Sequence, residues 1–326
     1  MSSFNQLVSI CIPTYQRPDL LRQAIASCLA QTYSDIEIIV CDDSKDDASK
    51  RMVQGLNKSE KIRYYQNRPA LGQAGNVNRL FDLAQGDRLV LLHDDDILLP
   101  DAVQSMSDCW LNHPNLVACF GKQHIVNMAG EVLQMPSQNL NDGYYRTEQY
   151  AGLQPSALWS ALVAQFPNDG YMILTEVAKT IRYRDTANVG DVCDYDFGLR
   201  VAAAYTSFFF LNQYTAVYRL TERAVSTGNN HSDLVYQLIE ALNLPEDLEE
   251  TRQDLLERYA CPAINRWLTI SDKASAYRVY TSSSYPWSKR LSPRGLIQAI
   301  LLACPNSLNR LLIDQLKSKQ PTPFKA

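Results

Sequence analysis

Apolar stretches of two kinds alternate along the first hundred residues. Short runs rich in aliphatic and aromatic residues have the length of buried strands, and the segments between them place apolar residues at helical spacing. Regular alternation of strand and helix is typical of an α/β fold with a parallel sheet wrapped by helices. The predicted strands are Leu7–Ile12, Ile36–Cys41, Ile62–Gln66 and Arg88–Leu92, and the predicted helices are Asp19–Ala30, Lys50–Asn57 and Asn76–Ala84.

The pattern is less regular between residues 100 and 225. Apolar spacing and turn-forming residues predict a mixture of helices and strands there. The predicted segments are the helices Pro100–Asn112 and Leu153–Ala164, a hairpin of Leu116–Val126 with Glu131–Gln134, a strand passing into a short helix over Met172–Ile181, a loop at Val189–Asp196 leading into a helix that ends at Ala204, and a strand at Tyr214–Leu220.

The pattern becomes helical after about Ser226. We therefore expect an α/β domain over residues 1–225 and a helical C-terminal region over residues 226–326. Pro305 divides the last predicted helix into two short ones. The predicted helices are Ser232–Leu242, Leu248–Tyr259 and Leu296–Leu316.

The composition is that of a folded protein with a slightly acidic balance. Of the 326 residues 46% are hydrophobic and 20% are charged, and the formal net charge is -4. A nucleic-acid partner needs a basic face, so the charge argues against one. The N-terminus is short and polar, and no apolar run approaches the ~18–20 residues that cross a bilayer. We therefore expect a cytoplasmic protein that can rest on the inner face of the membrane.

Eight cysteines are distributed through the chain without a CxxC pair, which argues against a zinc site. Several of them lie within apolar stretches. We expect these to be small buried side chains of a protein in a reducing compartment. They are Cys11, Cys28, Cys41 and Cys119.

Three adjacent carboxylates, Asp94, Asp95 and Asp96, follow directly on the fourth predicted strand. Ligands of parallel α/β sheets bind at the carboxyl edge of the strands, where polar clusters that are distant in sequence converge. Adjacent carboxylates repel one another. A divalent cation with oxygen ligands, Mg²⁺ or Mn²⁺, relieves that repulsion and can bridge to a diphosphate. The alternative is a solvated acidic loop.

Two further polar clusters follow the first and second predicted strands. Asp42 and Asp43 end the second strand, where a carboxylate can accept a hydrogen bond from a nucleobase or from ribose hydroxyls. The alternative there is an Asx-type turn. Pro13, Thr14 and Tyr15 follow the first strand. The Tyr15 ring can stack on a base or, alternatively, pack in the interior.

These clusters resemble the motifs of the family 2 glycosyltransferases. The resemblance is carried by VSICIPTYQRPDLLRQAIASCLAQTYSDIEIIVCDDSKDD near the N-terminus and by LGQAGNVNRLFDLAQGDRLVLLHDDDILLPD further on. It is close over about the first 105 residues and looser up to about Ser226, with four separated motifs in order. It implies a GT-A fold, which is a Rossmann-like, mostly parallel sheet wrapped by helices. It also implies a nucleoside-diphosphate sugar donor, UDP-linked, with a Mn²⁺ or Mg²⁺ ion and inversion at the anomeric carbon.

The resemblance divides the α/β domain into two halves. It assigns donor binding to about residues 1–105 and acceptor binding to about residues 106–225. Matched position by position, it implies that the donor contacts Pro13, Thr14, Tyr15, Arg17, Asp42, Asp43, Asn76, Asn78 and Asp94.

The metal motif of the family, written Asp-x-Asp, falls on the three adjacent carboxylates. Many members of the family have an aspartate where this chain has His93. Asp95 therefore matches the motif best, and the resemblance makes it a metal ligand together with Asp94 and Asp96.

The segment GDVCDYDFGLR, residues 190–200, resembles the family's Glu-Asp-Tyr-x-Leu-x-Leu-Arg segment. The aspartate of that segment opens a helix and points at the acceptor, and it maps to Asp194. The resemblance thus makes Asp194 the catalytic base. Cys193 replaces the family's preceding glutamate, and Asp191 can supply the missing carboxylate. Helix capping is the alternative role of Asp194.

The resemblance therefore implies an inverting glycosyltransferase that acts on a glycan or a lipid-linked acceptor. Cys193 and Thr221 depart from the family, because Thr221 stands where a histidine is usual, and His231 lies close enough in sequence to replace it. These departures leave open a catalytically silent module that binds a nucleotide sugar. A sugar-phosphate nucleotidyltransferase would carry a glycine-rich, basic loop after the first strand. This chain has PTYQRPD there, which argues against that class of enzyme.

The C-terminal region combines basic and aromatic residues ahead of an apolar helix. Basic groups attract anionic headgroups and aromatic rings favour the membrane interface. We therefore expect peripheral membrane contact there. The alternative is that these helices pack on the α/β domain and the basic groups form a solvated rim. The residues concerned are Tyr277, Arg278, Tyr280, Tyr285, Trp287, Lys289, Arg290 and Arg294.

Overall fold

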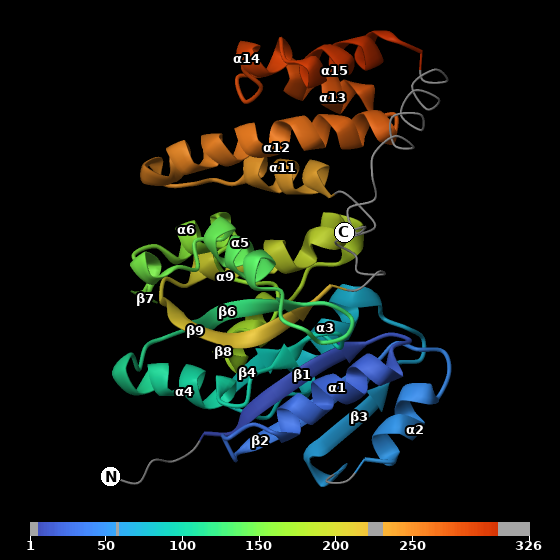
Figure 1. Cartoon of the computed structure of the whole chain (residues 1–326), viewed down its shortest axis with the longest axis vertical. Helices are drawn as coiled ribbons and strands as arrows, with labels where there is room; N and C mark the ends of the chain where they lie inside the picture. The colour runs from blue at the N-terminus through green and yellow to red at the C-terminus, as the bar shows by residue number, and fades with distance from the viewer. Residues whose placement is uncertain (1–5, 57–58, 221–230, 306–326) are drawn as a thin grey trace. The chain divides into compact units, whose positions relative to one another are not determined.

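The computed structural model describes residues 6–56, 59–220 and 231–305 (Figure 1). The chain divides into two compact units, Met1–Ala224 and Val225–Ala326. The first contains a mixed β-sheet with helices, and the described part of the second is helical. The predicted boundary near Ser226 falls outside the described residues.

The described residues of the first unit form a nine-stranded sheet with the order β3-β2-β1-β4-β8-β6-β9-β5, in which β7 also pairs with β9. Strands β1 to β4 run parallel, β6 and β9 are parallel to each other, and β8 lies antiparallel between β4 and β6. The strands are β1 (Val8–Thr14), β2 (Ile36–Asp42), β3 (Ile62–Gln66), β4 (Arg88–Leu91), β5 (Ile97–Leu98), β6 (Ala118–Val126), β7 (Gly152–Leu153), β8 (Met172–Leu174) and β9 (Phe208–Arg219).

Helices cover both faces of this sheet. Helices α1, α2 and α4 share a core with alternate strand residues such as Ile10. Helices α3, α7 and α9 lie on the other face, where the Cys11 thiol donates to the carbonyl of Leu80 and the Phe81 ring contacts Phe197. Burial on both faces explains why β1 and β2 are apolar at nearly every position. The helices are α1 (Pro18–Leu29), α2 (Ala48–Gln54), α3 (Gly72–Leu83), α4 (Ala102–Asn112), α7 (Thr175–Ile181) and α9 (Cys193–Ala204).

The strands and helices predicted for the first hundred residues are confirmed, with ends displaced by a few residues. The largest displacement is at α3, which begins at Gly72 instead of Asn76. Its first turn contains two glycines and a glutamine, so it shows no apolar periodicity that would reveal the helix.

The second half of the sheet domain departs further from the prediction. The predicted hairpin is reduced to a single bridge between Val126 and Val132, and α5 (Gln134–Gly143) begins where the second strand was expected. The predicted helix Leu153–Ala164 shortens to α6 (Ala157–Leu162), because Leu153 pairs in the sheet and the Ser156 hydroxyl caps the helix. Within the predicted loop at Val189–Asp196, the chain is already helical. It forms α8 (Thr186–Val189), a 3-10 turn (Gly190–Val192) and then α9.

The described part of the second unit consists of helices packed around Tyr236, Trp267 and Tyr285. Helix α12 continues to Thr269, past its predicted end at Tyr259, and α13 was not predicted. The part of the last predicted helix from residue 306 onward lies outside the described residues. The helices are α11 (Ser232–Ala241), α12 (Glu249–Thr269), α13 (Lys273–Thr281), α14 (Trp287–Arg290) and α15 (Pro293–Ala303).

All eight cysteines lie within the described residues as free thiols, and six of them are buried. The burial predicted for Cys11, Cys28, Cys41 and Cys119 is confirmed. In the part of the chain that the structure describes, no helix combines the length and apolar character needed to span a bilayer.

A buried carboxylate joins the strands at the amino edge of the sheet. Glu37, at the start of β2, accepts hydrogen bonds at Oε1 from Ser9 Oγ (2.6 Å) and Gln85 N (2.7 Å). Its Oε2 pairs with Arg63 Nη1 at 2.6 Å. Buried charges are tolerated when they are paired and hydrogen-bonded in this way. Glu37 therefore links β1, β2 and β3 to the chain that enters β4.

We expect Glu37→Gln to lower the free energy of unfolding by about 2 kcal/mol, because Arg63 loses its charged partner. Urea unfolding followed by circular dichroism measures the change. The matched control is Asp47→Asn, which removes an exposed ion pair with Arg68 and should change stability by less than about 0.5 kcal/mol. Equal stability of the two variants would contradict a structural role for Glu37.

Candidate functional site

The acidic loop, residues 93–96, begins where β4 ends. The amide of Leu92 still donates to the carbonyl of Cys11 (3.0 Å), and the chain then turns so that the Asp96 amide donates to the carbonyl of His93 (3.2 Å). The ends of β1 and β2 lie alongside, with Thr14 opposite Asp42 in the register. The predicted polar clusters therefore meet because parallel strands end at one edge.

Asp94 turns toward the loop that follows β1. Its Oδ2 accepts hydrogen bonds from Thr14 Oγ1 (2.6 Å) and Tyr15 N (3.4 Å). Arg17 Nη1 lies 3.3 Å from Asp94 Oδ1 and 2.7 Å from Asp95 Oδ2. Burial raises the pKa of Asp94 to about 6, although the Thr14 hydroxyl and the Arg17 guanidinium favour its charged form. Asp94 is thus held by donors of the chain itself.

The other three side chains of the acidic loop converge on one point. Potential ligand atoms of His93, Asp95 and Asp96 lie within 4.8 Å of one another. Asp96 is 2% exposed, and its Oδ1 accepts a hydrogen bond from Arg219 N (2.8 Å). Among the described residues, no donor reaches Asp96 Oδ2. A buried carboxylate oxygen without a donor is costly, and either a cation or a proton shared with the neighbouring Asp169 carboxylate would satisfy it. The residues present therefore fit a divalent metal ion.

The electrostatics of the cluster also favour a cation. Burial raises the pKa of Asp96, and the nearby carboxylates of Asp169 and Asp95 raise it further. Burial by itself lowers the pKa of His93, but the surrounding carboxylates outweigh it and raise that pKa above its ordinary value. The pKa values of Asp96 and His93 are both raised because negative charge is in excess in a buried space.

A further carboxylate, Asp169, belongs to this cluster and was not predicted. It is fully buried, and its Oδ1 accepts a hydrogen bond from Gln123 Nε2 (3.2 Å). Its Oδ2 accepts one from His93 N (3.3 Å). Gly170 follows with a φ of +70°, and its amide donates to the carbonyl of Leu91 (2.7 Å), which places this turn beside the end of β4. A lone aspartate before a glycine has the sequence signature of a turn, so no motif could reveal it.

Helix α9 brings the predicted base to the same cluster. Asp194 lies in its first turn, is partly exposed, and accepts a hydrogen bond from Tyr195 N (2.8 Å). Burial raises the pKa of Asp194, while this hydrogen bond and the nearby His93 side chain lower it. Asp191 lies in the preceding 3-10 turn and is exposed, and Cys193 is buried. Asp194 is therefore the carboxylate of this segment that shares the electrostatic environment of the acidic loop.

Asp196 has a different environment from Asp194. It is buried, and its Oδ2 accepts hydrogen bonds from Arg184 Nε (2.9 Å) and Arg200 Nε (2.8 Å). Arg200 also donates to the carbonyl of Ile181 (2.6 Å). This carboxylate therefore holds α9 against the segment that follows α7.

The end of β9 fixes the acidic loop from the other side. The backbone amide of the buried Arg219 donates a hydrogen bond to Asp96. Its side chain donates from Nε to the carbonyl of Asp95 (3.2 Å) and from Nη2 to Gln23 Oε1 (2.9 Å). Thr221, where the family's histidine was expected, lies outside the described residues. His231, its suggested replacement, immediately precedes α11 in the second unit.

On the predicted donor side, Asp42 is fully buried. Its Oδ1 accepts a hydrogen bond from Ser44 N (2.7 Å) and its Oδ2 one from the Tyr64 hydroxyl (2.5 Å). Ser44 Oγ in turn accepts from Gln16 N (2.7 Å), which joins the loops after β1 and β2. Tyr15 is 52% exposed beside this junction. The Tyr15 ring is therefore accessible to a ligand. The buried Asp42 instead holds the loop after β2 in place through its hydrogen bonds.

Asp43 and Asn76 share one hydrogen-bond network. Asn67 Nδ2 donates to Asp43 Oδ1 (2.6 Å) and to Asn76 Oδ1 (3.0 Å). Asn76 Nδ2 donates to the carbonyl of Cys41 (3.1 Å). The Leu71 amide also donates to Asp43 Oδ1 (3.1 Å). In this structure both predicted donor-binding residues join β2 to α3.

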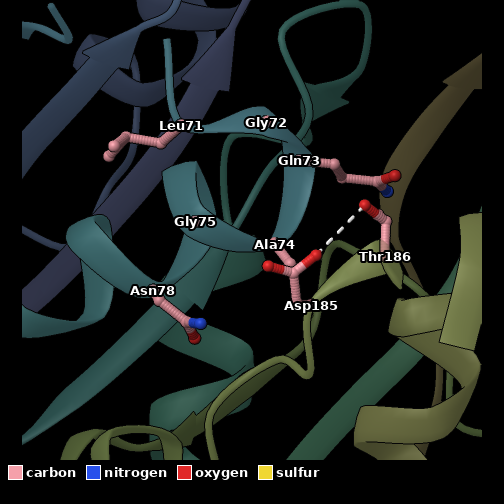
Figure 2. A pocket seen from close by; sticks show the side chains of 8 residues that line it. All are labelled: Leu71, Gly72, Gln73, Ala74, Gly75, Asn78, Asp185 and Thr186. Atoms are coloured by element: carbon pink, nitrogen blue, oxygen red, sulfur yellow. Dashed lines mark hydrogen bonds between the residues drawn. The ribbon is translucent and has the colours of Figure 1, made fainter. Parts of the chain in front are cut away.

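Asn78 holds the segment before α8 against α3. Its Nδ2 donates to the carbonyl of Tyr183 (2.9 Å), and its Oδ1 accepts from the Tyr183 amide (2.8 Å). A small pocket of about 110 Å³ lies beside it. Figure 2 shows its lining side chains between the first turn of α3 and the start of α8. This volume is well below the roughly 300 Å³ of a typical ligand site. The pocket is lined by Leu71, Gly72, Gln73, Ala74, Gly75, Asn78, Asp185 and Thr186.

Comparison with known proteins identifies relatives of the N-terminal part. Residues 9–156 match the family model described as Glycosyl transferase family 2. A stretch of 101 residues, 30% of this chain, is 40% identical to GalNAc(5)-diNAcBac-PP-undecaprenol beta-1,3-glucosyltransferase of Campylobacter jejuni and spans 33% of that protein. A stretch of 121 residues, 37% of this chain, is 31% identical to UDP-Glc:alpha-D-GlcNAc-diphosphoundecaprenol beta-1,3-glucosyltransferase WfgD of Escherichia coli and spans 47% of it. The matched parts are thus less than half of either relative.

Solved structures resemble the chain over most of its length. S. aureus TarS 1-349 in complex with UDP-GlcNAc superposes with a TM-score of 0.64 at 14% identity, covering 98% of this chain and 93% of TarS 1-349. Mannosyltransferase PcManGT from Pyrobaculum calidifontis, in complex with GDP-Man and Mn2+, gives a TM-score of 0.55 at 14% identity, covering 95% and 88%. These likenesses concern the fold. With the mixed sheet and the helical C-terminal region, they confirm the predicted GT-A architecture.

We expect Asp196→Asn to destabilise the fold without loss of ligand binding. Removing the charge of Asp196 should lower the free energy of unfolding by about 2 kcal/mol. The loss is smaller than when a fully buried ion pair is broken, because Arg184 and Arg200 are partly exposed and can be hydrated. Chemical unfolding checks the stability, and calorimetry with UDP and Mn²⁺ checks binding. Loss of binding by a variant that remains folded would place Asp196 in the ligand site.

Proposed function

Because residues 9–156 belong to glycosyl transferase family 2, we propose that this chain moves a sugar from a nucleoside-diphosphate donor to an acceptor hydroxyl, with inversion at the anomeric carbon. The supporting observation is that the acidic loop and Asp194 share one electrostatic environment at the carboxyl edge of the sheet. A site of this kind can hold a diphosphate through a cation and place a base near an attacking hydroxyl.

The donor in this proposal is UDP-linked. The name of the E. coli relative includes UDP-Glc, and the TarS neighbour was solved with UDP-GlcNAc. The exposed Tyr15 ring is suited to stack on the base, with Pro13 and Thr14 beside it, and we assign base and ribose recognition to the loops that Asp42 and Asp43 support. Arg17 is a further donor contact in this proposal, whereas Asn76, Asn78 and Asp94 act through the hydrogen bonds that position the loops around the donor.

A divalent cation, Mn²⁺ or Mg²⁺, is assigned to the acidic loop, with Asp95 and Asp96 as ligands. When bound, such a cation neutralises charge that develops on the departing diphosphate. Arg17 reaches both Asp94 and Asp95, so its guanidinium lies next to the expected position of the phosphate oxygens and can pair with them. The Mn2+ in the PcManGT neighbour supports this assignment.

Asp194 acts as the base in this proposal. Its partial exposure lets an acceptor hydroxyl reach it, and the rise of its pKa by burial makes the carboxylate a stronger proton acceptor. The hydroxyl proton passes to Asp194 while the hydroxyl oxygen attacks the anomeric carbon and the nucleoside diphosphate leaves from the opposite side. Asp191 is exposed and serves at most to orient the acceptor.

The acceptor in this proposal is a glycan hydroxyl, either free or linked to a lipid diphosphate. The names of the C. jejuni and E. coli relatives both include undecaprenol diphosphate acceptors. We assign acceptor binding to the half of the domain from about residue 106 to residue 225.

A screen of nucleotide-sugar hydrolysis with and without Mn²⁺ tests the proposed function. We expect metal-dependent release of sugar from a UDP-sugar. Asp194→Asn should slow it by about 10²–10⁴-fold while calorimetry shows UDP and Mn²⁺ still bound. Asp191→Asn is the matched control and should change the rate only a few-fold.

The reverse ranking of these two variants would show that Asp191 is the base. UDP binding without turnover of any UDP-sugar, with or without an acceptor, would favour the catalytically silent module instead.

The surface of α14 and α15 is proposed to contact an anionic membrane. Trp287 is 70% exposed, and Arg290 lies 4.8 Å from the centre of its ring. Tyr285, one of the aromatic residues expected at this interface, is instead buried and donates a hydrogen bond to Gln298 Oε1 (2.7 Å). It therefore belongs to the core of the second unit. The large apolar residues exposed on these helices and their connection are Trp287, Leu291, Leu296, Ile297 and Ile300.

Flotation with anionic vesicles tests this contact. We expect the full chain to float with vesicles that contain an anionic lipid. The triple variant Trp287→Ala, Leu291→Ala, Ile300→Ala should float much less, because burial of these side chains in the interface is lost. Leu111→Ala, an exposed apolar residue of the first unit, is the control. Equal flotation of all three proteins would remove α14 and α15 from the membrane contact.

A further inference from the structure

The geometry of the acidic loop points to His93 as a direct ligand of the metal ion, completing a set with Asp95 and Asp96. This inference rests on the proposed function and makes it more specific, because it adds one imidazole to the two carboxylates of Asp95 and Asp96. Asp94 is not a metal ligand in this inference, and its hydrogen bonds hold the acidic loop against the loop after β1.

Arg17 Nη1 contacts both Asp94 and Asp95 and has to release Asp95 Oδ2 (2.7 Å) if that oxygen binds a metal, whereas Asp94 is also held by the loop after β1. Asp94 is directed toward the loop after β1, where it accepts hydrogen bonds from Thr14 and from the Tyr15 amide. Potential ligand atoms of His93, Asp95 and Asp96 lie within 4.8 Å of one another. Three ligands that each lie about 2.2 Å from one ion are roughly 3.1–3.8 Å apart in octahedral or trigonal geometry. Side-chain rotations that move the ligand atoms by about an ångström therefore complete the set.

The unpaired oxygen of Asp96 indicates where positive charge is required. Asp96 is almost completely buried, its Oδ1 is occupied by the Arg219 amide, and its Oδ2 has no donor among the residues that the structure describes. A cation between this oxygen, Asp95 and the His93 ring would satisfy it.

The residues behind His93 suit a metal-bound imidazole. Asp169 Oδ2 lies 3.9 Å from His93 Nδ1 and also accepts a hydrogen bond from the His93 amide. Gln123 holds the other oxygen of Asp169, and the buried guanidinium of Arg146 donates to Gln123 Oε1 (2.8 Å). A carboxylate beside one ring nitrogen is the usual support of a histidine that binds metal through the other. Nε2 is therefore the expected ligand atom.

A nitrogen ligand has a consequence for the choice of metal. Mg²⁺ favours oxygen ligands and binds nitrogen poorly, whereas first-row transition ions accept imidazole. We therefore expect the site to prefer Mn²⁺ over Mg²⁺, and we expect His93→Asp, which restores an all-oxygen set, to reduce that preference by roughly tenfold.

Electron spin-echo spectroscopy of Mn²⁺ bound to the full chain tests the assignment directly. Measured with Mn²⁺ alone and with Mn²⁺ and UDP, the wild-type protein should show modulation from one coordinated ¹⁴N. Labelling histidine with ¹⁵N should convert this modulation to that of ¹⁵N, without any change to the fold. His93→Asp should bind Mn²⁺ without the modulation. His113→Asn, at a histidine that packs against Phe209, should retain it.

The outcomes separate the inference from the function on which it rests. Stoichiometric Mn²⁺ binding without nitrogen modulation in the wild type would overturn the role of His93 and leave the proposed function standing. Modulation that persists in His93→Asp would assign the ligand to another histidine. Failure of the wild type to bind Mn²⁺, with or without UDP, would overturn the metal site itself.

Discussion

The burial of several carboxylates at one edge of the sheet is the constraint on which the site depends. Asp94, Asp96 and Asp169 are buried, and Asp95 and Asp194 lie close enough to act on the same His93 ring. Unit charges 4 Å apart interact by about 4 kcal/mol at the effective dielectric of a protein surface. Such a cluster is stable only if hydrogen-bond donors or cations offset the repulsion. The loop after β1 and the end of β9 supply some of these donors.

Buried carboxylates need hydrogen-bond donors or cations at both edges of the sheet, but the two edges meet this need differently. At the amino edge, Glu37 has donors from its own chain at both oxygens, so the carboxylate is complete without a ligand. At the carboxyl edge, the loop after β1 and the amide of Arg219 satisfy Asp94 and one oxygen of Asp96, but the second oxygen is left without a donor among the described residues. This difference, and not the number of acidic residues, distinguishes a structural carboxylate from a candidate ligand.

The sequence predicts those parts of the site that lie at the ends of regular strands. The acidic loop, Asp42 and Thr14 could be placed at one edge because β1, β2 and β4 have clear apolar patterns and parallel strands share an edge. Asp169, Gln123 and Arg146 could not, because each is a lone polar residue whose burial depends on the irregular second half of the domain. The roles of Asn76 and Asn78 were equally hidden, since their bonds to the Cys41 carbonyl and the Tyr183 backbone are tertiary contacts. Helix α13 was missed because its apolar positions are interrupted by lysine, serine and arginine.

The most direct test of the site is a crystal structure of the protein with UDP and Mn²⁺, with anomalous scattering recorded to locate the manganese. The site described above predicts one strong peak within about 2.3 Å of carboxylate oxygens of Asp95 and Asp96. It also predicts that the uracil lies at the ends of β1 and β2 beside Tyr15. A manganese peak away from the acidic loop, or a nucleotide bound elsewhere on the sheet domain, would contradict it.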